Sequence, residues 1–338
     1  MECNYIYGII EASEEKLFDL CGFAAYEEVY TIPYQDISAV VSDSEFVDYT
    51  SFPKDQVARY LLKHQQVIEK VIDSYTLIPM RLGTYAFNIE EVKEILCKGY
   101  MKFKDIFRKI DNKIEIDVVA TWNDLNSVIK EIGEKQEIKE LKEKMMSKTE
   151  GISVEDQIKV GSLIKNILNA KREKISSEVK SVLEGVSIDL KMHDLMDDRM
   201  IFNAAFLIDK DKKSRFEKEL DRLNESYDGE LDFRCISPLP PYSFYTTEVK
   251  KIPLDDIELA KRKLCLNNMA TKDEIIKAYR SKANLYHPDK NTDSPDAEKQ
   301  FNEIVRAYKI LLEYCDGNAC LPDGKEFSKN AIVVKVRE

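Results

Sequence analysis

Apolar residues in the first part of the chain recur with a period of two in some segments and of three to four in others. Five segments carry the apolar, β-branched and aromatic runs that are typical of strands. They are residues 4–10, 27–34, 37–44, 76–87 and 113–122. Two longer segments, 51–75 and 89–110, space their apolar residues as amphipathic helices do. This order contains a β-α-β-β-α-β core, so residues 1–124 are expected to form a ferredoxin-like α+β domain.

Two finer predictions concern the helices of this domain. A short helix is expected to begin with Ser13 as N-cap and to end at Gly22. In the helix at 51–75, Val57, Leu61 and Val71 share one apolar stripe with His64. A histidine on an apolar stripe is more often packed than catalytic, so His64 is interpreted as a packed residue.

The stretch 125–247 is expected to form a helical hairpin and a second small α+β domain. Residues 126–184 are rich in Lys and Glu with helical periodicity, broken once at 147–153, which favours two antiparallel helices. The more ordinary alternative is a pair of helices that cover a sheet. A strand, a helix and a strand then follow at 200–209, 212–227 and 229–237.

A proline-rich segment leads from this domain to the last part of the chain. Pro238, Pro240 and Pro241 argue against a helix and predict a rigid extended segment over 237–249. Residues 248–256 are then expected to be a linker.

Residues 257–315 predict an all-α module built around an antiparallel helical hairpin. Thr271 and Glu274 form the capping-box pattern that begins one long helix, and Pro288 ends it. A second long helix begins after Ser294. The two apolar stripes are Ile276, Tyr279, Ala283 and Tyr286, and Phe301, Ile304, Tyr308 and Leu311. The triplet His287-Pro288-Asp289 begins the loop between the helices, and the tail 316–338 ends in an apolar alternation that could return as a strand.

Composition and charge limit the classes of function. Hydrophobic residues make up 43% and charged residues 33% of the 338, as in a soluble globular protein. The net charge of −11 disfavours partners such as nucleic acid or anionic membranes. There is no secretory signal pattern and no apolar run of about 20 residues. Seven scattered cysteines without a C-x-x-C pair indicate reduced thiols, so a cytoplasmic location is expected.

Motifs for catalysis, cofactors or metals are missing from the first 247 residues. They contain no G-x-G-x-x-G, P-loop, G-x-S-x-G or H-E-x-x-H pattern. His193 has acidic neighbours in a loop, which is more often a surface arrangement than a metal site. We therefore expect no enzyme activity, no cofactor and no metal.

Several ordered segments of the body resemble the GvpF/GvpL family of gas vesicle proteins. They are YIYGII, HQQVIEKVI, LIPMRLGTYA, IEIDVVATW and SPLPPYSFY. Leu82 replaces a family aromatic, and the Gly and Trp that usually open the last segment are missing. The resemblance implies a gas vesicle accessory protein that binds the small, hydrophobic shell protein, through an edge strand or an apolar groove.

The C-terminal module resembles a J domain, the activator of DnaK-type chaperones. The resemblance rests on AYRSKANLYHPDKN and the aromatic pattern downstream. It implies that His287, Pro288 and Asp289 dock on the chaperone and stimulate its ATP hydrolysis. It also implies that the basic residues Lys277, Arg280 and Lys282 meet an acidic chaperone surface.

This module departs from the J-domain pattern at several positions. Ala260 and Lys261 stand where the family usually has paired aromatics, and Lys282 and Asn284 stand at usually apolar positions. The Gly/Phe-rich linker and the zinc repeats of full DnaJ proteins are missing. A degenerate module kept only for packing is the alternative.

The resulting hypothesis is a cytoplasmic assembly factor, associated with gas vesicles, that binds shell protein and recruits a DnaK-type chaperone. Two alternatives remain open at the level of sequence. The chain could be a minor component of the vesicle wall with a non-functional J-like module, or a general J-domain co-chaperone.

Overall fold

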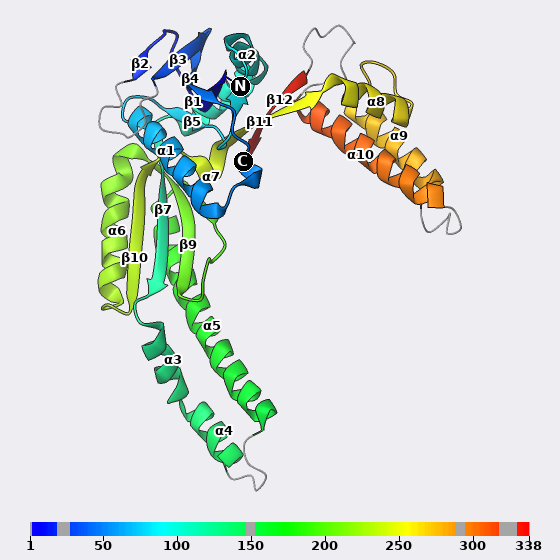
Figure 1. Ribbon diagram of the computed structural model, residues 1–338. Helices are drawn as coiled ribbons and strands as arrows, with labels where there is room; N and C mark the ends of the chain where they lie inside the picture. Colours follow the sequence, from blue (N-terminus) through cyan, green and yellow to red (C-terminus); the bar gives the residue numbers. More distant parts are fainter. Residues whose placement is uncertain (1, 19–27, 147–152, 288–294, 318–329, 338) are drawn as a thin grey trace. The chain divides into compact units, whose positions relative to one another are not determined.

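The computed structural model describes residues 2–18, 28–146, 153–287, 295–317 and 330–337, which form two compact units. One unit combines Met1–Lys109 with Tyr245–Glu338, and the other is Ile110–Phe244. Figure 1 shows the elements of both. The sequence had instead suggested breaks after residues 124 and 247.

The first unit contains an antiparallel sheet whose centre is β1 (Glu2–Ile10). Its strand order is β2-β3-β4-β1-β5, and the short β6 also pairs with β1. The other strands are β2 (Leu17–Phe18), β3 (Val29–Tyr34), β4 (Ile37–Glu45), β5 (Leu77–Pro79) and β6 (Tyr85–Ala86). From Cys3 onward every residue of β1 is buried, as expected for a central strand covered on both faces.

Two helices accompany this sheet, α1 (Lys54–Ile72) and α2 (Ile89–Ile110). The apolar stripe predicted for α1 is buried only in the C-terminal half of the helix, where His64 and Val71 lie. Leu61 is 51% exposed, so its inclusion in the core was wrong. A 3-10 helix, η1 (Tyr49–Ser51), precedes α1.

The helix predicted from Ser13 to Gly22 is not present in the residues described there. Leu17 and Phe18 form β2 instead, because they pair with Tyr30 and Val29 of β3. Residues 19–27, including Gly22, lie outside the described residues.

The strand predicted to close the first domain, β7 (Lys113–Trp122), belongs to the second sheet. That sheet has the order β10-β7-β9-β8, with β8 at Asp189–Met192, β9 at Met200–Asp209 and β10 at Leu231–Leu239. A local pattern predicts a strand but not its partner, and β7 finds long antiparallel partners in both β9 and β10. The α+β class is confirmed, but the ferredoxin-like prediction for residues 1–124 is wrong in its place. The β-α-β-β-α-β order is formed in the second unit by β7, β8, β9 and β10 with their helices.

Four longer helices complete the second unit. They are α3 (Leu125–Gly133), α4 (Gln136–Met146), α5 (Val154–Glu184) and α6 (Lys213–Ser226). The segment 126–146 is therefore two helices, with a break at Glu134–Lys135. Figure 1 shows α3 and α4 alongside the N-terminal part of α5. The C-terminal part of α5 buries Ile175, Val179 and Leu183 in the core of the sheet. The N-terminal part of α5 thus takes part in the predicted helical hairpin, and its C-terminal part covers the sheet.

The proline-rich segment is not extended throughout. A four-residue helix, α7 (Tyr242–Tyr245), follows Pro241 directly. Prolines that precede a helix do not break it, because the first helical residues need no intrahelical N–H bond.

The C-terminal module is helical, as predicted, but two strands are added to it. Its helices are α8 (Leu254–Leu264), α9 (Lys272–Leu285) and α10 (Pro295–Gly317). The expected linker at 248–256 is wrong, since β11 (Thr246–Pro253) runs directly into α8. The end of the tail forms β12 (Asn330–Arg337), which pairs antiparallel with β11 along its whole length.

Candidate functional site

The helix that carries the basic candidate residues, α9, has a well-formed N-terminus. The backbone N–H of Thr271 donates to Glu274 Oε2 at 2.7 Å, and the N–H of Glu274 donates to Thr271 Oγ1 at 3.4 Å. The hydrogen bonds that the N–H and the hydroxyl of Thr271 donate to the Glu274 carboxylate lower the pKa of Glu274. The capping box read from the sequence is therefore confirmed.

The three candidate basic residues of α9 do not share one face. Lys277 and Arg280 are exposed and lie one turn apart, whereas Lys282 is half-buried. Lys282 comes two residues after Arg280, which is about 200° around an α-helix. Lys277 and Arg280 can therefore meet the same partner surface, and Lys282 points elsewhere.

His287 lies just beyond the end of α9 and is half-buried. Its ring stands edge-on to Phe301 of α10, with 5.5 Å between ring centroids and 70° between planes. This contact fixes the start of the interhelical loop against the neighbouring helix. Pro288 and Asp289 lie outside the described residues.

The core of the module differs from the predicted stripes by small shifts. Ile275, and not Ile276, is the fully buried residue of α9. Tyr279 stacks on Tyr308 with 3.9 Å between ring centroids, while Ile304 and Leu311 are fully buried. Facing aromatic stripes do join the two helices, as predicted.

The two departures in the first helix are both accommodated in this core. Ala260 and Lys261 are buried, and Lys261 Nζ lies 2.5 Å from Glu258 Oε1. A buried lysine is costly unless paired, and this pair meets that need. The module therefore stays packed, although Ala260 and Lys261 stand where the family usually has aromatic residues.

The ribbon of β11 and β12 belongs to the same core. Ile252 of β11 and Ala331 and Val333 of β12 pack with the apolar residues of α8 and α10. Neither the helical pattern nor the resemblance to a J domain indicated that strands would complete it.

The same ribbon contacts α2 and the segment after β5 in the N-terminal part of its unit. The N–H of Arg81 donates to the carbonyl of Thr247 at 2.8 Å, and Lys102 Nζ donates to the carbonyl of Val334 at 2.7 Å. Lys251 and Glu91 form an ion pair at 2.7 Å with both side chains largely buried. Two hydrogen bonds to backbone carbonyls and one ion pair thus join the J-like module to the body.

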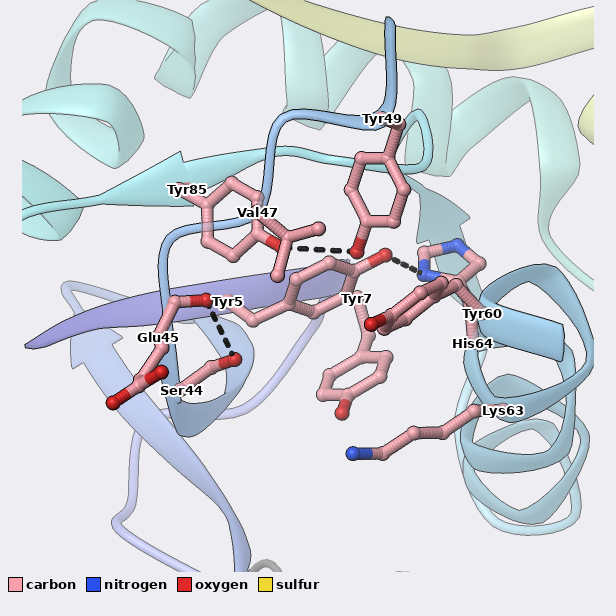
Figure 2. Close-up of a pocket in the computed structure, with 10 residues that line it drawn as sticks. All are labelled: Tyr5, Tyr7, Ser44, Glu45, Val47, Tyr49, Tyr60, Lys63, His64 and Tyr85. Atoms are coloured by element: carbon pink, nitrogen blue, oxygen red, sulfur yellow. Dashed lines mark hydrogen bonds between the residues drawn. The ribbon is translucent and has the colours of Figure 1, made fainter. Parts of the chain in front are cut away.

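A pocket with a volume of about 270 Å³ lies in the first unit, between β1, β6 and α1. Figure 2 shows its side chains. The floor consists of the buried residues Tyr5, Tyr7, His64 and Tyr85. Tyr5 and Tyr7 point to the same face of β1 because they are two residues apart, and their ring centroids are 4.7 Å apart.

His64 is packed in the floor of this pocket, as predicted. Its Nδ1 lies 2.7 Å from the hydroxyl of Tyr5. Burial lowers the pKa of His64 to about 4 and raises the pKa of Tyr5 well above its usual value. The pair is therefore neutral at physiological pH.

The positive φ of Gly83, +83°, allows the turn that brings Tyr85 to the pocket. A Cβ at this position would lie 3.0 Å from the ring of Tyr49, so a larger residue would also crowd that ring. Sequence analysis missed this pocket. The available signals were the alternation of Tyr5 and Tyr7 and the four-residue spacing of Tyr60 and His64.

In the second unit, the proline-rich segment is held by a buried carboxylate of β7. The N–H and the hydroxyl of Ser243 each donate to Glu115 at 2.8 Å, and Ser243 Oγ lies 3.2 Å from His193 Nε2. Burial, reinforced by the Asp117 carboxylate, raises the pKa of Glu115. The arrangement fixes the segment that the sequence had singled out, and His193 is exposed, as expected.

Comparison with known proteins matches both parts of the chain. The family model described as "Gas vesicle synthesis protein GvpL/GvpF" matches residues 3–246. The chain belongs to this gas vesicle protein family. A model of the DnaJ domain matches residues 262–314.

Individual relatives agree with this assignment to the GvpL/GvpF family. Gas vesicle protein F of Nostoc sp. (strain PCC 7120 / SAG 25.82 / UTEX 2576) is 26% identical over 71% of this chain and 96% of its own length. The crystal structure of GvpF from Anabaena sp. PCC7120 has the same fold, with a TM-score of 0.62 and 24% identity, over 72% of this chain and 98% of its own. The chaperone protein DnaJ of Chlorobium phaeobacteroides is 58% identical over 48 residues, 14% of this chain and 12% of its own.

Among the helices of the described residues, none has the length and apolar character needed to cross a membrane.

Proposed function

We propose that this chain is an assembly factor that binds gas vesicle shell protein and recruits a DnaK-type chaperone through its C-terminal J domain. Gas vesicle family membership and the DnaJ match support the two halves of the proposal. One observation carries the chaperone half. Lys277 and Arg280 are exposed on one side of α9, and His287 lies just beyond the end of the same helix.

In this proposal the chain itself catalyses no reaction. His287 and the two residues that follow it contact the chaperone, which hydrolyses ATP. Lys277 and Arg280 orient the encounter, because exposed charges of one sign mainly provide steering and specificity. The acidic remainder of the chain would keep the client complex in solution near the growing vesicle.

The test is a steady-state ATPase assay with a DnaK-type chaperone and the full chain. His287→Gln is expected to abolish the stimulation, and Lys277→Glu or Arg280→Glu to weaken it at least tenfold at low salt. Lys282→Glu is the matched control on the same helix, and it should retain stimulation within about twofold of the wild type.

Equal stimulation by the wild type and His287→Gln would contradict the chaperone half of the proposal. If the chain also copurified with washed vesicles, such a result would favour a wall component with an inactive J-like module.

A further inference from the structure

We infer that the tyrosine-lined pocket of the first unit is the site that binds the client, the gas vesicle shell protein. The pocket would receive a large uncharged apolar side chain from a peptide segment of this client. The inference rests on the function proposed above and specifies its client-binding surface. The pocket volume of about 270 Å³ matches a single anchoring side chain better than a whole cofactor.

The surface of the pocket is made of aromatic ring faces and edges. The hydroxyl groups of Tyr49 and Tyr85 bond to each other at 2.9 Å, and those of Tyr5 and Tyr7 bond to His64 and Ser42 at 2.7 and 3.1 Å. Because these hydroxyls are bonded within the protein, the rings themselves offer mainly carbon surface to an incoming group, while other side chains of the lining contribute a comparable polar surface. The ring faces favour an apolar anchor, as do the pockets at the centre of protein interfaces.

The two opposite charges at the rim together favour neither a cationic nor an anionic anchor. Glu45 and Lys63 both line the pocket, and Figure 2 shows them on either side of the Tyr7 ring. The ammonium group of Lys63 would repel a lysine or arginine side chain, which the ring faces would otherwise attract. The carboxylate of Glu45 would repel an anionic group. One rim group of each sign instead suits a neutral peptide, which carries both N–H donors and C=O acceptors.

The aromatic surface continues outside the pocket. Phe46 is 52% exposed, and its ring lies 5.4 Å from Tyr85 and 6.4 Å from Phe87. Tyr60 forms the opposite rim, is 36% exposed, and contacts Tyr49 and Phe52. A continuous row of partly exposed rings around a pocket is the surface expected for a segment that lies across it and inserts one residue.

The experiment measures how tightly the full chain binds fluorescein-labelled peptides that tile the gas vesicle shell protein, by fluorescence anisotropy. At least one peptide with an uncharged apolar anchor should bind the wild type. Tyr60→Ala, which removes a rim ring, and Val47→Trp, which fills the pocket, should each weaken that binding at least tenfold.

Leu62→Ala is the matched control, since Leu62 is 63% exposed and lies about 200° around α1 from Tyr60. It should change the affinity less than twofold. All three variants should keep the circular dichroism spectrum and the urea unfolding midpoint of the wild type, which shows that the pocket region is folded.

The possible outcomes separate the two proposals. If peptides bind the wild type and all variants equally, the pocket assignment is overturned and the client-binding function stands. The assignment is also overturned if the tightest peptide depends on a lysine, arginine or acidic anchor. If no peptide binds the wild type, the client half of the proposed function fails, and the pocket assignment fails with it.

Discussion

At the scale of single residues, His64 shows how one side chain links the fold to solution behaviour. It is 2% exposed, accepts or donates one hydrogen bond with Tyr5, and stays neutral because burial lowers its pKa to about 4. The unfolded chain would bind a proton at this residue below about pH 6.5. Acid should therefore favour the unfolded state through His64 in a window between the two pKa values.

We expect His64 to lower the free energy of unfolding by about 2 to 3 kcal/mol as pH decreases from about 6.5 to 4, and His64→Gln to remove this contribution. At His64 the unfolded state binds more protons than the folded state in this window, so its contribution to stability is lost toward acid. Urea unfolding at pH 7 and pH 4.5 measures it. The control His193→Gln replaces an exposed histidine and should keep the full loss of unfolding free energy at acid pH. An unchanged loss in His64→Gln would contradict the assignment of this loss to His64.

At the scale of elements, the β11–β12 ribbon connects the body to the J domain where a linker was expected. It contributes Val333 to the core of the J domain, and its Thr247 accepts a backbone hydrogen bond from Arg81 of the body. The matched J-domain segment, 262–314, includes neither strand. The module in this chain should therefore depend on its own tail.

Val333→Ala should destabilise the J domain by about 2 kcal/mol, because it removes two buried methyl groups and leaves a cavity. Hydrogen exchange of the amides in α10 reports that change locally. Arg337→Ala, at an exposed residue of the same strand, should cost less than about 0.5 kcal/mol. Equal protection of α10 in Val333→Ala and the wild type would mean that the ribbon is not part of the module.

The elements also show which features local sequence could predict. Thr271 and Glu274 marked the start of α9 correctly, since a capping box involves only neighbours in the chain. The sheet to which β7 belongs, the exposure of Leu61 and the pairing of the tail with β11 all depend on distant partners. The pocket was missed for the same reason, because β1, β6, η1 and α1 each contribute only one to three of its residues.

At the scale of the whole molecule, a body of the GvpL/GvpF family is joined to a J domain within one chain. The body supplies a pocket for an apolar anchor, and the J domain supplies the basic turn of Lys277 and Arg280 together with His287. In the proposed function the two features are coupled, and the chaperone acts on a client that the body already holds.

The most direct measurement of this coupling is the rate at which labelled shell protein leaves the full chain when a DnaK-type chaperone and ATP are added. The account predicts release at least tenfold faster from the wild type than from His287→Gln, although both bind the client with equal affinity beforehand. The same release rate for the two proteins, with the chaperone and ATP present, would contradict it.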